Sequence, residues 1–186
     1  MKKLALLTAI ITIISVNTFA VPADKATEDH KVTISIPKVA LLDLEGSKDI
    51  TLKIDGPSEA GEAVSFANAT NNDVWVNYSS IAEGNKTRKV TVEISQDVPS
   101  GVYLKVLASG YSGNGKGALG TAGSILTLKT TAQDIVTKVG SCYTGDGVDN
   151  GHNLTYSLAL TADADYEKLV EGNTEITVTY TLVDEN

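Results

Sequence analysis

The sequence predicts an all-β fold, an antiparallel Ig-like β-sandwich of about 8–10 strands. The clearest evidence is residues 174–183, in which Ile176, Val178, Tyr180 and Leu182 alternate with threonines. A strand directs successive side chains to opposite faces, so this stretch has one apolar face and one hydroxyl-bearing face. Similar short segments recur along the chain with turn residues between them, and no long segment has a helical period. This pattern favours a sandwich over βαβ units.

The segments expected to form strands are rich in β-branched residues, most with period-two alternation: residues 31–36, 39–44, 49–54, 63–67, 74–78, 90–94, 102–107, 124–129, 135–139, 153–160 and 174–183. Pro37 cannot donate to a ladder, so the first segment is expected to be an edge strand or to stop there. Trp75 is expected to fill the core. The glycine-rich stretches 109–123 and 140–151 are expected to be loops, because glycine loses backbone entropy in regular structure. Residues 163–170 are expected to form one helical turn or a loop.

The first 20 residues are expected to be a Sec-type signal peptide. Lys2 and Lys3 precede an apolar run from Leu4 to Val16, and small residues lead up to Ala20, with a second possible cleavage site after Ala23. The apolar run is shorter than the roughly 20 residues that span a membrane, which leaves a buried N-terminal helix as the alternative. We therefore expect an exported protein.

Cleavage after Ala20 would leave residues 21–30 as a disordered leader and residues 31–186 as a single sandwich domain. Without the two signal-peptide lysines, 13 basic residues face 23 acidic ones, a net charge of about −10. Such a surface repels phosphate backbones and anionic lipids. Nucleic acid is therefore not expected as a partner, and neither is membrane insertion after cleavage.

Catalytic chemistry is poorly supported, and we expect no enzymatic activity. Cys142 is the only cysteine, so no internal disulfide is possible, and either burial or pairing with another chain would explain it; burial is favoured. The two histidines are His30 in the leader and His152 in an expected loop. Cys142 and His152 are ten residues apart, yet no third group that would orient such a pair is evident. No catalytic residue, cofactor or metal ligand is assigned.

Two motifs are better explained as structure, and a third by chance in a chain rich in threonine. Gly110, Gly115 and Lys116 match the opening of a phosphate-binding loop, but position 117 is glycine and no helix is expected to follow. Residues 146–151 are rich in Asp, Asn and Gly, which favours a turn over a calcium loop because the ligand spacing is wrong. Asn-x-Ser/Thr triplets, which would matter only in a eukaryotic secretory route, begin at Asn68, Asn77, Asn85 and Asn153.

The order of these features resembles bacterial fimbrial, or pilus, subunits. Residues 32–36 followed by 41–43 are similar to the start of some such subunits, and residues 176–180 are similar to their end. The resemblance is one of layout and covers most of the mature chain, although the disulfide that many fimbrial subunits carry is missing. It implies a structural protein of the bacterial cell surface.

The resemblance also implies assembly by strand addition, in which the N-terminal segment of one subunit fills a hydrophobic groove in a neighbour. Val32, Ile34 and Ile36 would be the side chains that fill it. The implied partners are other copies or related subunits, with a periplasmic chaperone as a further partner. The alternative is that this strand pairs within its own chain, the usual fate of a terminal strand.

A function of a different class is a secreted binding module for a glycan or a surface protein. Loops at one end of a sandwich are common recognition sites. Tyr111 and Tyr143, in the two glycine-rich stretches, are the candidate residues. Against this function, aromatic residues are only 5% of the chain, and sugar-binding surfaces depend on exposed rings.

Overall fold

The computed structural model describes residues 27–185, and these divide into two units at Ser35/Ile36. The predicted signal peptide, residues 1–20, and most of the predicted leader lie outside the described residues. In the first unit, residues 27–35 have no regular secondary structure, and all their side chains are exposed. Within residues 27–185, every strand lies in the second unit.

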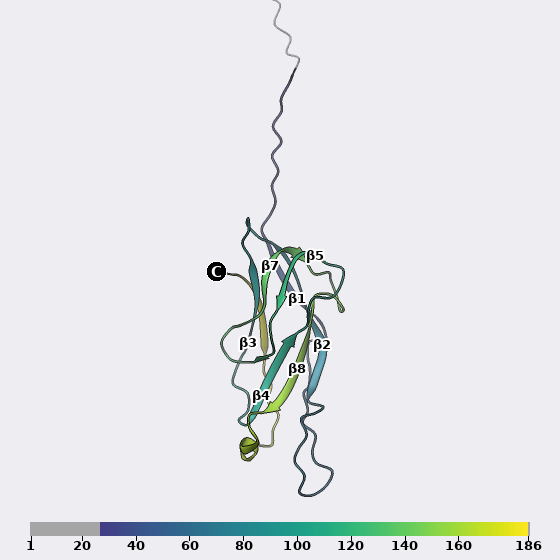
Figure 1. Cartoon of the computed structure of the whole chain (residues 1–186), viewed down its shortest axis with the longest axis vertical. Coiled ribbons are helices and arrows are strands. Elements are labelled where there is room, and N and C mark those ends of the chain that lie inside the picture. Colours follow the sequence, from purple (N-terminus) through teal and green to yellow (C-terminus); the bar gives the residue numbers. More distant parts are fainter. Residues whose placement is uncertain (1–26, 186) are drawn as a thin grey trace, which may run out of the picture. The chain divides into compact units, whose positions relative to one another are not determined.

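The second unit is all-β, as predicted, with only antiparallel ladders (Figure 1). Its elements are β1 (Val39–Gly46), β2 (Thr70–Ile81), β3 (Arg88–Ile94), β4 (Val102–Ala108), β5 (Lys116–Ala122), β6 (Leu126–Thr127), β7 (Gln133–Tyr143), β8 (His152–Leu160), the 3₁₀ helix η1 (Asp163–Lys168) and β9 (Val178–Asp184). The hydrogen-bonded order is β6-β4-β8-β2-β7-β3-β9, with β1 paired to β2 and β5 paired to β7. The C-terminal end lies at the end of the sandwich opposite η1 (Figure 1).

Period-two alternation builds the core, as the sequence indicates. In β3, every second residue from Arg88 to Ile94 is buried, and β8 buries His152, Leu154 and Tyr156 in the same way. The same alternation in β2 buries Val74 and Val76. Trp75 therefore lies half-buried on the opposite face of β2, and the prediction that it fills the core is wrong.

The two glycine-rich stretches contain more strand than predicted. β5 lies within residues 109–123, and β7 continues to Tyr143, so Cys142 lies on a strand rather than in a loop. Glycine is needed in the β5–β7 pair because the backbones of the two strands approach closely. A Cβ on Gly117, whose φ is +98°, would lie 2.2 Å from the carbonyl oxygen of Ser141. The ladder also shifts register between Gly117 and Leu119, which is typical of a β-bulge.

Five predicted strands are missing or shorter, since residues 124–129 retain only the two-residue β6 and the strand within residues 174–183 begins only at Val178. Residues 31–36 and 49–54 belong to no ladder among the described residues, and residues 63–67 form only the single bridge between Asp55 and Ser65. Residues 163–170 contain the short helix η1, as expected. The missing ladders of residues 31–36 and 49–54 bear on function, because each segment has alternating apolar residues and no partner strand among the described residues.

Candidate functional site: two unpaired strand edges

The last strand, β9, has one free edge in the described part of the chain. It pairs only with β3, and it ends the hydrogen-bonded order of the sheet. Thr177 accepts a backbone bond from Ser95 at 2.9 Å, and Glu185 donates one to Thr87 at 2.9 Å, so odd-numbered residues bond to β3. In an antiparallel ladder the alternate residues direct their N–H and C=O groups the other way. The backbone groups of Val178, Tyr180 and Leu182 therefore face the free edge.

The first strand, β1, is likewise paired on one side only, with β2. The backbone N–H of Leu44 bonds to Oδ1 of the neighbouring Asp43 at 2.8 Å rather than to another strand. After β1 the chain continues through residues 49–54 in extended form, again without a ladder. An edge of this kind is a template for pairing with another chain.

Apolar side chains from both edges are only half-buried, although they pack against the core. They are Leu42, Leu44, Ile50, Leu52, Ile176, Val178 and Leu182, called here the open-edge residues. All come from β1, from the extended segment after it, or from β9 and the residue pair before it. A strand added at either edge would cover these residues further.

Arg88 joins the two edges at the end of the sandwich where β1 begins and β9 ends. Its side chain is 2% exposed; Nη1 donates to the carbonyl oxygen of Val39 and to Oγ of Ser80 at 2.7 Å. Its Nε donates to Oδ1 of Asp184 at 3.0 Å, and Lys38 Nζ lies 3.2 Å from the other carboxylate oxygen. Lys38 and then Arg88 lower the pKa of Asp184. We call this end of the sandwich the Val39 end.

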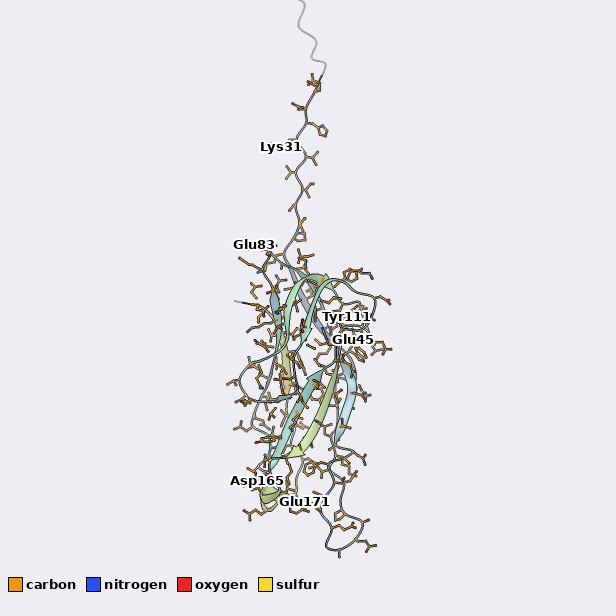
Figure 2. All side chains as sticks on the ribbon, viewed as in Figure 1. Lys31, Glu45, Glu83, Tyr111, Asp165 and Glu171 are labelled. Carbon is orange, nitrogen blue, oxygen red and sulfur yellow. The ribbon has the colours of Figure 1, made fainter. Side chains whose placement is uncertain are left out.

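The predicted strand-addition residues are exposed in an extended segment. Val32 is 69% exposed, Ile34 82% and Ile36 74%. The side chains of this segment, Lys31 among them, project from an extended backbone (Figure 2). Three large apolar side chains at alternate positions are thus ready to enter an apolar surface, but the described chain buries none of them.

The connection to β1 opposes folding this segment back onto its own sandwich. Only Pro37 and Lys38 separate Ile36 from Val39, the first residue of β1. A two-residue hairpin favours type I′ or II′ turns, which need a positive φ at the first central position. Proline is locked near a φ of −65°, so Pro37 disfavours the turn that self-pairing beside β1 would need.

The two loop tyrosines are in different environments. Tyr111 is half-buried: its hydroxyl donates to the carbonyl oxygen of Thr144 at 3.1 Å and accepts a bond from the backbone N–H of Gly115, and Figure 2 shows its side chain. Its ring meets that of His152 edge-on. Tyr143 is 51% exposed at the end of β7. Tyr111 therefore holds loops together, and Tyr143 alone of the two has a ring available for contact.

Cys142 and His152 do not form a nucleophile–base pair. Both ring nitrogens of His152 are engaged, Nδ1 2.8 Å from the carbonyl oxygen of Ser109 and Nε2 2.8 Å from the hydroxyl of Tyr78. Cys142 is buried, and burial raises the pKa of its thiol to about 11. A thiol with this pKa is a weak nucleophile at neutral pH.

The pKa of His152 leads to a prediction about stability. Burial lowers this pKa, against the opposing effect of hydrogen bonds to Ser109 and Leu119. As the pH falls below about 6.5, the unfolded chain binds a proton that the folded chain does not, so the free energy of unfolding falls until the folded-state pKa is reached. Urea denaturation at pH 7.5, 6.5 and 5.5 should show this loss. In a His152→Gln variant the slope over this range should be shallower, and equal slopes would contradict the assignment.

Hydrogen bonds of Asn150 hold the Asp-rich turn, residues 146–151, together and connect it to the loop that contains Asn114. Asn150 Nδ2 donates to the carbonyl oxygen of Asp146 at 2.8 Å, and Asn150 Oδ1 accepts a bond from the backbone N–H of Asn114 at 3.3 Å. Over residues 27–185, no group of three or more His, Cys, Asp or Glu side chains is arranged to hold a metal ion. Lys116 begins strand β5, so no helix follows the partial phosphate-loop motif.

Comparisons with family models, with curated proteins and with solved structures found no match to this chain. Within the described residues, no helix is long and apolar enough to cross a membrane. The candidate site therefore depends on its own geometry: two unpaired edges, the open-edge residues, and an exposed apolar segment that leads into β1. Sequence reasoning identified the segment but missed the free edge of β1 and the role of Arg88. The apolar alternation of residues 49–54 was the sequence feature that could have indicated the free edge of β1.

Proposed function

We propose that the protein is an exported structural subunit of a bacterial surface fibre that assembles by strand addition. Residues 31–36 of one copy would pair with the free edge of β9 in another copy. The observation that carries the proposal is the coexistence, in one chain, of an unpaired strand edge with half-buried apolar residues and an exposed segment of alternating apolar residues. Strand addition of this kind is a recurrent mode of peptide recognition.

The length of residues 31–36 is close to that of β9, and their apolar alternation suits pairing beside it. Six residues in a strand span about 20 Å at roughly 3.4 Å each, which is slightly shorter than the seven residues of β9 would span. Val32, Ile34 and Ile36 lie on one face of such a strand, and the open-edge residues would cover them. Thr33 and Ser35 would face outward, where hydroxyls remain solvated.

Addition between copies is favoured over self-pairing. Pro37 and Lys38 are the only residues between the segment and β1, and Pro37 opposes the two-residue hairpin geometry. A different copy has no such restriction. Exposed edges also invite unwanted pairing, so an exported subunit would need a periplasmic chaperone to cover β9 until assembly.

The test separates the segment from the sandwich. Deleting residues 21–36 removes no buried side chain from the described chain, so the truncated sandwich should fold. We expect residues 21–186 to form concentration-dependent oligomers in analytical ultracentrifugation, and the truncated protein to remain monomeric. A synthetic peptide of residues 29–38 should bind the truncated protein with one-to-one stoichiometry and raise its melting temperature.

A scrambled peptide of the same composition is the control, because it keeps hydrophobicity but loses alternation. Equal binding of both peptides would reject the specific strand addition. If residues 21–186 stay monomeric at high concentration and neither peptide binds, the structural-subunit function is wrong. A monomer of that kind would favour a binding module instead.

A further inference from the structure

A hollow lies at the Val39 end of the sandwich, and none of the open-edge residues lines it. It has a volume of about 460 Å³, and its exposed wall is almost entirely apolar. Val39, Ile81, Lys116, Cys142 and Tyr143 are among the residues that line it. Four strands, β1, β2, β5 and β7, meet around it. We call it the β1 pocket.

The β1 pocket lies beside the point where the strand-addition segment enters the sandwich. Val39 is both a lining residue of the pocket and the first residue of β1. Pro37 and Lys38 alone connect it to Ile36, and three residue steps cover about 10 Å when fully extended. If residues 31–36 are inserted into a second copy, the body of that copy must begin within about 10 Å of Val39.

We propose that the β1 pocket is a docking surface for the body of the copy that receives the strand; this inference rests on the proposed function. The short connection brings the receiving copy to the Val39 end whichever direction the added strand runs. Tyr143, 51% exposed at the rim, is the side chain that gains most by being covered. The wall is apolar, and water-exposed apolar surface is stabilised when a partner covers it.

The experiment compares two exposed tyrosines in residues 21–186. Tyr143→Asp places a charge at the pocket rim, and Tyr103→Asp places one on β4, at a residue that is 41% exposed and does not line the pocket. Assembly is measured by analytical ultracentrifugation. We expect Tyr143→Asp to weaken assembly at least tenfold and Tyr103→Asp to change it less than threefold. Lys116→Glu, on the neighbouring strand of the rim, repeats the test without altering β7.

Binding of the peptide of residues 29–38 to the truncated protein separates this inference from the proposed function. The peptide has no body, so its affinity should be the same for truncated proteins with and without Tyr143→Asp. Weaker assembly with unchanged peptide affinity supports docking at the β1 pocket. Unchanged assembly in both rim variants overturns it and leaves strand addition intact. If no peptide binds and nothing assembles, strand addition is wrong and the pocket proposal falls with it.

Discussion

Replacing Ile34 with aspartate is expected to weaken the assembly of residues 21–186 at least a hundredfold. Ile34 is the central apolar residue of the proposed strand and is 82% exposed in the free chain, so the substitution should leave the sandwich itself unchanged. Burying an isoleucine contributes about 2–3 kcal/mol, and a carboxylate in the same place must also lose its hydration. At about 1.4 kcal/mol per tenfold, the loss of the apolar contribution alone approaches the expected factor.

Thr33→Asp is the matched control for Ile34→Asp. It introduces the same charge one residue away, on the face that would point to solvent in an added strand. We expect it to change assembly by less than tenfold, with both variants measured by sedimentation over the same concentration range. Similar losses for Thr33→Asp and Ile34→Asp would show that charge rather than side-chain direction matters, which contradicts pairing as a strand.

The sequence predicted those features that depend on local alternation. Residues 174–183 and 90–94 place their apolar residues inward, as period two requires, and β9 and β3 were expected for that reason. Glycine-rich β5 could not be predicted, because its glycines are selected by close approach to β7 rather than by strand propensity. Whether a strand finds a partner is also a long-range property. Residues 31–36 and 49–54 alternate well, yet no described strand pairs with either.

In the candidate site, too, local alternation predicts some features, whereas others depend on long-range strand pairing. Alternation indicated Val32, Ile34 and Ile36 as residues for strand addition, because a period-two pattern before a proline is visible in the sequence. The free edges of β1 and β9 depend on the strand order, which leaves β9 at the end of the ladder and pairs β1 with β2 alone. Arg88 gave no signal, because an arginine in an alternating strand is ordinarily solvated.

Arg88→Ala is expected to lower the free energy of unfolding by about 3 kcal/mol. The substitution leaves the carbonyl oxygen of Val39 and the hydroxyl of Ser80 without a buried donor, at about 1 kcal/mol each, and empties the space of a large side chain. Lys89→Ala is the control, since Lys89 is the next residue and its ion pair with Asp134 at 2.9 Å is partly exposed. A pair of this kind contributes at most about 1 kcal/mol.

Urea denaturation of the truncated protein measures both variants without interference from assembly. If Arg88→Ala and Lys89→Ala lower the free energy of unfolding by amounts that agree within about 1 kcal/mol, the role given to Arg88 is contradicted. Arg88→Met then separates packing from hydrogen bonding, because methionine fills most of the volume but donates no hydrogen bond. We expect Arg88→Met to recover only the packing part of the loss, about 1 kcal/mol, because it restores neither the bond to Val39 nor the bond to Ser80. The Arg88→Met variant should still bind the peptide of residues 29–38 about tenfold more weakly, because the guanidinium is the buried group that connects the start of β1 to the end of β9.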